Sequence, residues 1–399
     1  MTTNTQAIHD LLTRSVEEVI DGEHLRTRLE NGTPLRVKFG IDPTSPHLHI
    51  GRMVPLLKLR DFQILGHKII LLVGNATGVI GDTSDKESER PMLERATVEE
   101  NMRTYVSQVE KILDMDAVEV VYNADWLDAL NFREIGELAG AFSVQEFIRR
   151  DNIKRRLDAG TRVSLREVLY PLMQGYDSVH LRADVEVGGT DQRFNMLAGR
   201  TLQAQYGQSP QDVVMTPLIL GTDGRKMSSS WGNTINLTDD ARTMFGKVMS
   251  IPDSLIVPYF MHCTRTPLED VIAIERGMAD ETVHPRDAKL RLAETLVTLL
   301  HDADAAAAER IYFIETFSKK TVPTDAPSLS VAAGTPLVEA LVEEGLATSK
   351  SDARRKIRQR GVRIDAEVVT DETLRIEAAQ EGSILRVGKT NFRTIHINT

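Results

Sequence analysis

Residues 40–52 form a stretch whose side chains are suited to binding phosphate and ribose. Thr44 and His49 carry short donors that match phosphate oxygens, and Asp42 could hold an ammonium group or a ribose hydroxyl. The glycines at either end would let the backbone come close to a ligand. The stretch therefore predicts a nucleotide cradle. An ordinary strand-to-helix turn with surface histidines is the alternative, and a metal site at His47 and His49 lacks a third ligand nearby in the sequence.

The residues on both sides of this stretch predict the elements that would position it. Residues 35–39 alternate in polarity as a strand does, and apolar residues recur at helical spacing from Leu56 to Phe62 until Gly66 ends the pattern. Residues 69–73 predict a second buried strand. A strand, loop, helix and strand make a βαβ unit, and ligands of open α/β sheets bind beyond the carboxyl ends of the strands. The predicted cradle lies at that place.

A second set of polar side chains falls on one helical face. Tyr170, Gln174 and Asp177 are spaced as i, i+4 and i+7, which brings them to the same side of a helix. Their apolar neighbours Leu172 and Met173 would be buried on another side. The polar set therefore needs a partner or a ligand, although a solvent-exposed polar stripe is the alternative.

Two glycine-bearing turns carry further candidates. Residues 183–187 alternate as a strand and run into residues 188–192, where Asp191 could accept ribose hydroxyls. Residues 224–230 contain Lys226 and a run of serines, and glycines on both sides would let this loop close over a pyrophosphate. An ordinary turn and a basic hairpin tip are the respective alternatives.

Composition limits the classes of protein that remain. The 399-residue chain carries 48 Lys and Arg against 58 Asp and Glu, a formal net charge of −10, so nucleic-acid binding would require a local basic patch. Cys263 is the only cysteine, which excludes an intramolecular disulfide and a zinc site built on paired cysteines. The sequence shows neither a basic and apolar leader nor an uncharged apolar run of membrane-spanning length. We expect a cytoplasmic protein with no membrane partner.

Patterning divides the chain into successive domains. Strand and helix signals alternate over residues 1–238, which favours a largely parallel sheet covered by helices. Residues 239–320 read as helices, residues 321–334 as a linker, and residues 335–399 as a small α+β domain. We expect the core of this last domain to include the apolar residues Leu337, Val338, Leu341, Val342, Leu346, Val362, Ile364, Ile384, Leu385 and Val387.

Residues 97–112 predict one clear helix within the first domain. Thr97 and Glu100 have the spacing of a capping box, which marks the start of a helix. Apolar residues then follow on one face as far as Ile112.

One basic segment, residues 349–363, stands out against the acidic background. Clustered cations provide the local patch that phosphate binding requires, although a solvated basic helix is the alternative. We expect RNA contacts from Arg354, Arg355, Lys356, Arg358 and Arg360.

The order of these motifs resembles that of a known enzyme family. The Asp-Pro-Thr and His-Ile-Gly runs at residues 42–44 and 49–51 are similar to the first signature of class I aminoacyl-tRNA synthetases, in the form used by bacterial tyrosyl-tRNA synthetases. Residues 224–230 resemble the second signature, residues 78–84 the family's glycine-rich turn, and residues 188–192 its ribose and amino-acid clamp. The basic carboxyl-terminal segment resembles the S4 RNA-binding module.

The resemblance implies a fold, a reaction and partners. It implies a Rossmann-like α/β catalytic domain with a parallel sheet, an all-helical anticodon-binding domain and a small α+β S4-like domain. The reaction would activate L-tyrosine with ATP, accompanied by Mg²⁺ and without a tightly bound metal, and then transfer tyrosyl to the 3′ end of tRNA(Tyr). The resemblance also implies a homodimer, with its interface in an insertion near residues 120–165 and above all around residues 130–156.

The resemblance further implies roles for individual residues. Those implied in catalysis are Thr44, His49, Arg52, Lys226 and Ser229. Those implied in ATP binding are Gly40, Asp42, His49, Gly51, Gly189, Asp191, Lys226, Met227 and Ser228. Those implied in tyrosine binding are Lys38, Asp82, Tyr170, Gln174, Asp177 and Gln192.

Three positions depart from the family pattern. Arg52 replaces the second histidine of the first signature, Ser229 replaces a lysine of the second, and Lys38 stands where many bacterial members have a tyrosine against the substrate phenol. We expect the cation at Arg52 to compensate in part for the missing lysine. A tryptophanyl synthetase, a nucleotidyltransferase of the same superfamily and a catalytically silent RNA-binding paralogue are the rival interpretations.

Overall fold

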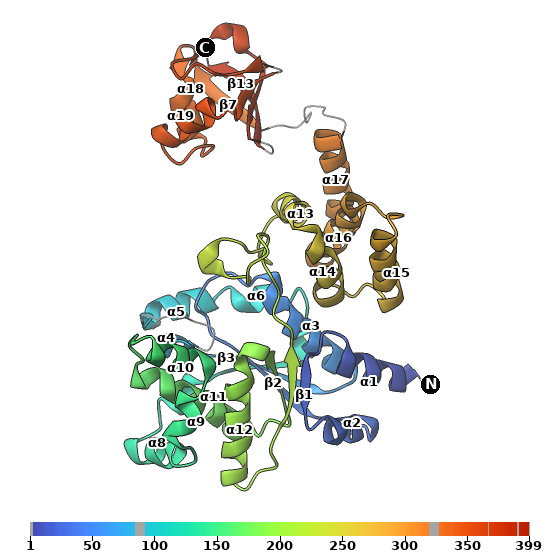
Figure 1. Cartoon of the computed structure of the whole chain (residues 1–399), viewed down its shortest axis with the longest axis vertical. Coiled ribbons are helices and arrows are strands. Elements are labelled where there is room, and N and C mark those ends of the chain that lie inside the picture. Colours follow the sequence, from blue (N-terminus) through green and yellow to red (C-terminus); the bar gives the residue numbers. More distant parts are fainter. Residues whose placement is uncertain (1–2, 84–91, 319–326, 366, 389–390, 399) are drawn as a thin grey trace. The chain divides into compact units, whose positions relative to one another are not determined.

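The computed structural model describes residues 3–83, 92–318, 327–365, 367–388 and 391–398. The chain forms two compact units, Met1–Ala307 and Ala308–Thr399, and the division falls inside helix α17 (Figure 1). The first unit contains a mostly parallel sheet and many helices, and the second is a small α+β unit. The predicted fold class is confirmed.

A six-stranded sheet forms the centre of the first unit. Its strand order is β1-β6-β5-β2-β3-β4, and all neighbouring strands are parallel except β1 and β6. The strands are β1 (Glu18–Ile20), β2 (Arg36–Ile41), β3 (Lys68–Val73), β4 (Val118–Tyr122), β5 (Val185–Gly189) and β6 (Asp212–Thr216). All residues of β3 after the first are buried, as expected for a parallel strand covered on both faces. The strands predicted at residues 35–39 and 69–73 are confirmed as β2 and β3.

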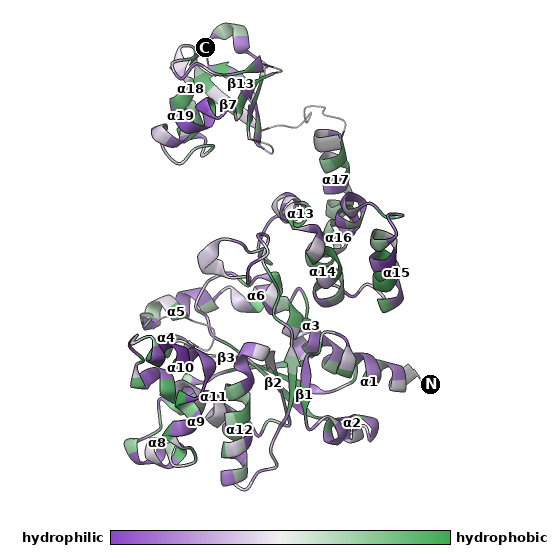
Figure 2. Ribbon diagram, viewed as in Figure 1, coloured by the Kyte–Doolittle hydropathy of each residue, from purple (hydrophilic) through white to green (hydrophobic). Residues whose placement is uncertain are grey.

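Helices pack around this sheet. They are α1 (Thr3–Thr13), α2 (Gly22–Glu30), α3 (Ile50–Ile64), α4 (Thr77–Ile80), α5 (Arg95–Met102), α6 (Tyr105–Val109), α7 (Ala124–Leu127), α8 (Phe132–Ala139), α9 (Val144–Ile148), α10 (Asp151–Asp158), α11 (Leu165–Leu181) and α12 (Arg193–Gln205). Helix α3 packs on β2, β3 and β5, and α12 packs on β5, β6 and α11. In Figure 2 the inner strands are coloured toward hydrophobic, whereas the outer helix α10 is largely hydrophilic. The sheet therefore supplies a rigid, apolar base for the loops at its edge.

The prediction of one helix that begins with a capping box at Thr97 is wrong. Helix α5 begins one turn earlier, after Glu94, whose side chain makes no capping hydrogen bond, so Thr97 lies inside the first turn. The helical run also divides into α5 and α6. At the break, Thr104 Oγ1 donates a hydrogen bond to the Pro46 carbonyl oxygen at 2.8 Å. The division ties this segment to the predicted nucleotide cradle.

A set of helices follows the sheet within the same compact unit. They are α13 (Ala241–Ser250), α14 (Ile256–Cys263), α15 (Leu268–Ala279), α16 (Pro285–Leu300) and the start of α17 (Ala303–Phe313). Helix α16 packs against α13 and α14, and α14 packs on α3. An ion pair of 3.0 Å between Arg265 and Asp61 joins the helical part to α3. No helix in the described part of the chain combines the length and apolar character needed to cross a bilayer.

The second unit is built on a five-stranded sheet with the order β10-β9-β12-β13-β7. Its strands are β7 (Ser328–Ala332), β9 (Val362–Ile364), β10 (Glu367–Val368), β12 (Ile384–Val387) and β13 (Asn391–Asn398), and β8 (Thr335–Pro336) pairs separately with β11 (Arg375–Ile376). Helices α18 (Leu337–Glu343) and α19 (Lys350–Arg358) contribute buried residues to one core with these strands.

Two details of this unit differ from the sequence-based expectation. Residues 328–332 of the predicted linker form β7, which pairs in parallel with β13, whereas residues 321–326 lie outside the described residues. Ile384 is not part of the core, although Leu385 is. Neighbouring residues of a strand point to opposite faces, so the run could not place both inside.

Candidate active site

A cavity of about 610 Å³ lies at the carboxyl ends of the parallel strands of the first unit. It is lined by residues from β2 and β5, from the start of α3, from one face of α11 and from the loop after β6. Every residue that the sequence implied in catalysis, ATP binding or tyrosine binding lines this cavity. The five candidate RNA-binding residues lie in the second unit.

The loop at residues 40–52 is held from outside by α6. Tyr105 OH donates to the Ser45 carbonyl oxygen at 2.7 Å. Gln108 Nε2 donates to the Pro46 carbonyl oxygen at 2.9 Å, and its Oε1 accepts a backbone N–H of the same loop at 2.7 Å. Neither Tyr105 nor Gln108 could be predicted from the sequence to hold this loop, because nothing local shows which loop a buried polar side chain will meet.

His49 lies at the start of α3 with its imidazole largely buried. Its Nδ1 is buried and has no hydrogen-bond partner among the described residues. Burial, followed by the charges of Arg52 and Lys226, lowers the pKa of His49 to about 3, so the ring is neutral at pH 7. A Cβ atom at Gly51 would lie 3.0 Å from Nδ1, so a larger residue there would crowd the ring. His49 can therefore offer a hydrogen bond but not a positive charge.

Asp42 is bonded within the protein at both carboxylate oxygens. Thr77 Oγ1 donates to Oδ1 at 2.7 Å, and Tyr170 OH donates to Oδ2 at 2.8 Å. Burial raises the pKa of Asp42 to about 6 in spite of these two donors. Asp42 thus joins the loop to α4 and α11, and a ligand would share its oxygens with these hydroxyl groups.

The polar face of α11 lines the cavity as its spacing predicted. Tyr170, Gln174 and Asp177 all border the cavity, and Asp177 is 2% exposed. Trp126 Nε1 donates to Asp177 Oδ1 at 2.8 Å, and Asn123 Nδ2 donates to Oδ2 at 3.2 Å. Burial raises the pKa of Asp177 to about 7. Neither donor could be predicted from a local motif, because both come from the segment after β4.

Lys38 is buried on β2 beside a residue that the sequence analysis did not single out. Its Nζ lies 3.0 Å from Oε1 of Glu186 on β5, and the two residues are direct partners across the parallel strands. The side chains are 1% and 2% exposed. The alternating polarity of residues 183–187 is typical of a strand with one solvent-exposed face. The burial of Glu186 depends on helices that cover both faces of the sheet, and the local sequence does not show this.

The loop with the second signature is ordered around Asn233. Asn233 Oδ1 accepts from Ser228 N at 2.9 Å, and its Nδ2 donates to Asp223 Oδ1 at 2.8 Å and to the Lys226 carbonyl oxygen at 3.1 Å. Lys226 Nζ lies 3.2 Å from Asp191 Oδ2, which brings this loop to the turn after β5. Asn233 lies shortly after the predicted motif at residues 224–230, and it was not predicted because it is not part of that motif.

The remaining predicted residues lie at two places along the cavity. Gln192 Nε2 donates to Asp82 Oδ2 at 2.7 Å, which connects the turn after β5 to the glycine-rich turn. Arg52 and Ser229 are exposed on its lining. Of the three positions that depart from the family pattern, Arg52 and Ser229 are therefore solvent-accessible, whereas Lys38 is buried.

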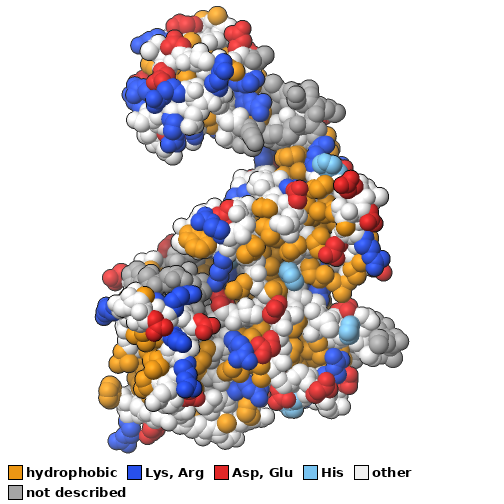
Figure 3. Space-filling view, in the orientation of Figure 1, with side chains coloured by type: hydrophobic (Ala, Val, Ile, Leu, Met, Phe, Trp, Pro, Cys, Tyr) orange, Lys and Arg blue, Asp and Glu red, His pale blue; other side chains and the backbone are white. Residues whose placement is uncertain are grey.

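The candidate RNA-binding residues lie on and after α19, whose N-terminal residue Ser349 accepts a hydrogen bond from Asp352 N. Arg355 and Lys356 pair with Asp352, and Arg358 lies 3.2 Å from Glu372. Arg354 and Arg360 are exposed and make no ion pair with a described residue. Lys and Arg side chains are prominent on the face of this unit in Figure 3.

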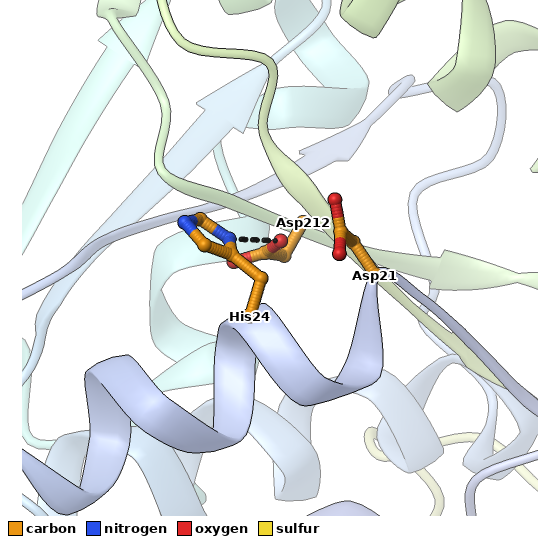
Figure 4. A group of neighbouring side chains, drawn as sticks. All are labelled: Asp21, His24 and Asp212. Atoms are coloured by element: carbon orange, nitrogen blue, oxygen red, sulfur yellow. Dashed lines mark hydrogen bonds and ion pairs between the residues drawn. The ribbon is translucent and has the colours of Figure 1, made fainter.

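A separate cluster of Asp21, His24 and Asp212 lies where β6 begins, at the sheet edge opposite the cavity (Figure 4). His24 Nδ1 lies 2.9 Å from Asp212 Oδ1. Arg28 is 3.9 Å from Asp212, and Arg200 is 3.4 Å from Asp21. Both carboxylates therefore have cationic neighbours, and the cluster fastens α2 to the sheet.

Comparison with known proteins agrees with this geometry. Residues 30–318 match the family model described as tRNA synthetases class I (W and Y), and residues 318–395 match the tyrosine–tRNA ligase SYY-like C-terminal domain. The tyrosine–tRNA ligase of Moorella thermoacetica is 44% identical over 97% of this chain and 95% of its own. That of Thermotoga maritima is 43% identical over 96% of both chains.

Solved structures agree at the level of the fold. A truncated mitochondrial tyrosyl-tRNA synthetase of Aspergillus nidulans superposes with a TM-score of 0.65 and 24% identity, covering 79% of this chain and 95% of its own. The matches along nearly the whole length set the tryptophanyl and nucleotidyltransferase alternatives aside. The chain belongs to the class I aminoacyl-tRNA synthetases and, within them, to the bacterial-type tyrosine–tRNA ligases.

Proposed function

We propose that this chain activates L-tyrosine with ATP and transfers the tyrosyl group to tRNA(Tyr) in the cytoplasm. The tyrosine carboxylate attacks the α-phosphorus of ATP, which gives tyrosyl-adenylate and releases pyrophosphate. A terminal hydroxyl of the tRNA then takes the tyrosyl group and releases AMP. No enzyme nucleophile is needed, so the work of the site is positioning and charge stabilisation.

One observation carries this proposal. The cavity brings Thr44 and His49 together with Lys226, which follows them by more than 170 residues, and with the polar face of α11. A nucleotide bound between the loop at residues 40–52 and the loop at residues 224–230 would therefore lie beside an amino acid held by α11. That is the arrangement needed for a carboxylate to attack a phosphate.

We assign the phosphates to Thr44, His49, Lys226 and Arg52. Lys226 and Arg52 supply positive charge, whereas neutral His49 supplies a hydrogen bond. Mg²⁺ would enter with ATP and neutralise phosphate oxygens when bound. Asp42, Asp82, Asp177 and Asp191 all accept bonds from protein donors, so we infer that phosphate oxygens and water hold most of its ligand positions.

The amino-acid part of the cavity suits a phenol. Asp177 is a buried carboxylate whose position is fixed by two donors, and it can accept a third hydrogen bond from a substrate hydroxyl. Phenylalanine would leave this acceptor without the substrate's hydrogen bond, which costs free energy in a buried site. Gln174, Tyr170, Asp82 and Gln192 are assigned to the ammonium end.

The test is pyrophosphate exchange into ATP. We expect exchange that depends on tyrosine and not on tryptophan or phenylalanine, and Asp177→Asn is expected to reduce the preference for tyrosine over phenylalanine. A catalytically silent paralogue would show no exchange with any amino acid, and that result would overturn the proposal.

We further propose a homodimer through the segment near residues 120–165. Large apolar side chains are exposed there: Phe132 is 91% exposed, Leu165 75% and Val144 70%. Hydrophobic side chains also gather over the region of α8 to α10 in Figure 3. Exposed apolar side chains that gather on one surface mark interaction sites. Analytical ultracentrifugation should find a dimer that Phe132→Asp weakens, and a monomeric wild type would contradict this assignment.

We propose that tRNA is bound by the helices of residues 239–320 and by the S4-like unit. Arg354 and Arg360 are exposed cations of α19 and the turn after it that make no ion pair with a described residue, and such cations are suited to phosphate oxygens. The fit of the basic residues to RNA supports this assignment in a chain whose net charge is −10.

A further inference from the structure

A buried pair of opposite charges lies under the amino-acid end of the cavity, in the segments where β2 and β5 run side by side. Lys38 and Glu186 are partners in the strand register and are almost completely buried. Charged side chains are rarely buried unless their hydrogen bonds are satisfied. The hydrogen-bond partners of Lys38 and Glu186 therefore indicate the role of the pair.

All three protons of the Lys38 ammonium group are matched by protein acceptors. Nζ lies 2.6 Å from Ser178 Oγ, 3.0 Å from Glu186 Oε1 and 3.2 Å from the Gln174 carbonyl oxygen. An ammonium group has three donors and no acceptor. Lys38 therefore has no proton left for a substrate phenol, in contrast to the contact that the family resemblance suggested for this position.

Glu186 accepts hydrogen bonds at both of its oxygens. Oε1 accepts from Lys38 and from Gln174 Nε2, the latter at 3.1 Å. Oε2 accepts from Gln211 Nε2 at 2.5 Å and from Ser178 Oγ at 3.3 Å. Glu186 is thus the group that binds the amide nitrogen of Gln174.

This contact decides which way the Gln174 amide faces. A carboxylate can only accept, so it selects the NH₂ group of Gln174 and leaves the carbonyl Oε1 for the other side. Gln174 also lines the cavity. An acceptor at that place suits the ammonium group of an amino acid, whereas a flipped amide would present its NH₂ donors to a cation.

We propose that Lys38 and Glu186 form a positioning pair that fixes the Gln174 amide with its oxygen toward the substrate ammonium group, and that Lys38 does not contact the substrate phenol. The inference rests on the proposed function, because it assumes that tyrosine binds in this cavity. Neither residue touches the reacting atoms, so both act through Gln174.

The test compares three inhibitors of tyrosine-dependent pyrophosphate exchange. L-tyrosinol carries both the phenol hydroxyl and the ammonium group, L-phenylalaninol lacks the hydroxyl, and 3-(4-hydroxyphenyl)propanol lacks the ammonium. In Glu186→Gln and in Lys38→Met we expect both amines to bind at least about tenfold more weakly, the ratio for losing one charge-assisted hydrogen bond, and the desamino compound to change by less than about twofold.

Two further variants separate positioning from general damage. Lys38→Met combined with Glu186→Gln removes both charges, and we expect its L-tyrosinol binding to stay at least about tenfold weaker than wild type although no unpaired charge remains, because no carboxylate is left to select the NH₂ group of Gln174. Lys58→Met removes another fully buried lysine, whose Nζ donates to the Leu11 carbonyl oxygen at 2.6 Å outside the cavity. It should lower thermal stability without changing L-tyrosinol binding.

The outcomes distinguish the alternatives. A loss in Lys38→Met confined to the two phenol-bearing compounds would mean that Lys38 contacts the phenol, and an equal loss for all three would mean general damage; either result overturns the inference. A folded double variant that recovers wild-type L-tyrosinol binding also overturns it, because the losses in the single variants would then come from an unpaired buried charge. Absence of tyrosine-dependent exchange in wild type would instead overturn the proposed function itself.

Discussion

The imidazole of His49 shows how a motif residue can have an unexpected chemical state. Burial, and then the charges of two neighbouring cations, keep the ring neutral by lowering its pKa, so its contribution to an adenylate-forming site is a hydrogen bond. The positive charge that the phosphates need must come from Arg52 and Lys226. In the two signatures, different residues therefore supply the hydrogen bond and the positive charge.

The pKa of His49 predicts a loss of stability in weak acid. The folded-state pKa is about 3 and the ordinary value is 6.5, so the unfolded chain binds the extra proton between these two pH values. The contribution to stability is complete above pH 6.5 and falls by up to about 1.4 kcal/mol per pH unit as the pH drops toward 3. Urea unfolding from pH 4 to 8 should show a shallower acid loss in His49→Asn than in wild type. An identical pH dependence in both proteins would contradict the assignment.

Asp177 predicts a pH dependence at the tyrosine end of the site. Its pKa of about 7 means that it gains its charge near neutral pH, and a charged acceptor binds a phenol more strongly. The kcat/KM for tyrosine should therefore rise through pH 7. Trp126→Phe removes a donor that favours the charged form, so the rise should move to higher pH, with activity at pH 7 reduced about threefold to tenfold. Asp177→Asn is the control, in which the rise at pH 7 should disappear.

Variants at Arg52 and Ser229 test whether the Arg52 cation replaces the lysine that the family pattern has at position 229. We expect Arg52→Ala to slow tyrosyl-adenylate formation by about tenfold or more, because it removes a charge from the phosphate end. Adding Ser229→Lys to this variant should restore most of the rate in stopped-flow measurements. Arg103→Ala, which removes an arginine 73% exposed away from the cavity, is the matched control. Compensation is the wrong explanation if Arg52→Ala has the wild-type rate and Ser229→Lys alone raises it greatly.

At the scale of elements, Asn233 predicts how the second-signature loop is held. Asn233→Ala removes one hydrogen-bond acceptor and two donated hydrogen bonds within one loop, while α11 and the tyrosine pocket are untouched. We expect the KM for ATP to rise, or the activation rate to fall, by at least about tenfold. Tyrosine binding, measured by equilibrium dialysis, should stay within about twofold of wild type. A parallel loss of tyrosine binding would show that the loop does not act independently of the pocket.

The elements that the sequence predicted best are those with strong local patterns. Strands β2 and β3 are continuous apolar or alternating runs, and α11 carries its polar residues at helical spacing. The break between α5 and α6 could not be seen, because it coincides with a hydrogen bond from Thr104 to a loop nearly 60 residues earlier. The sequence predicts a linker where β7 lies, because the partner strand, β13, lies at the other end of the domain.

In the candidate site too, the residues with a strong local pattern were the predictable ones. Residues inside recognisable motifs were found, and all of them line the cavity. The groups that orient them, such as Asn123, Trp126, Gln108 and Glu186, are single polar residues on other elements. Nothing in their local sequence distinguishes them from surface residues. Their roles depend on which strands and helices become neighbours.

At the scale of the whole molecule, the two compact units predict separable activities. Arg354→Ala with Arg360→Ala should raise the KM for tRNA and reduce the slope of log K against log salt by about 0.7–0.9 for each phosphate that is no longer neutralised. Pyrophosphate exchange with tyrosine should be unchanged, because the cavity lies in the first unit. Arg375→Ala, an exposed arginine of the same unit outside the basic segment, is the control for charge alone. A change in exchange would mean that the units are coupled.

The buried pair on β2 and β5 also has a consequence for how this family can diverge. A descendant that changes Lys38 or Glu186 alone carries an unpaired charge in its interior until the second change arrives. Such single-step ancestors would be selected against, so substitutions at positions 38 and 186 should occur together along a lineage. A relative with an uncharged residue at position 38 would then carry an uncharged residue at position 186 as well, and the two groups of enzymes would be separated by a double step.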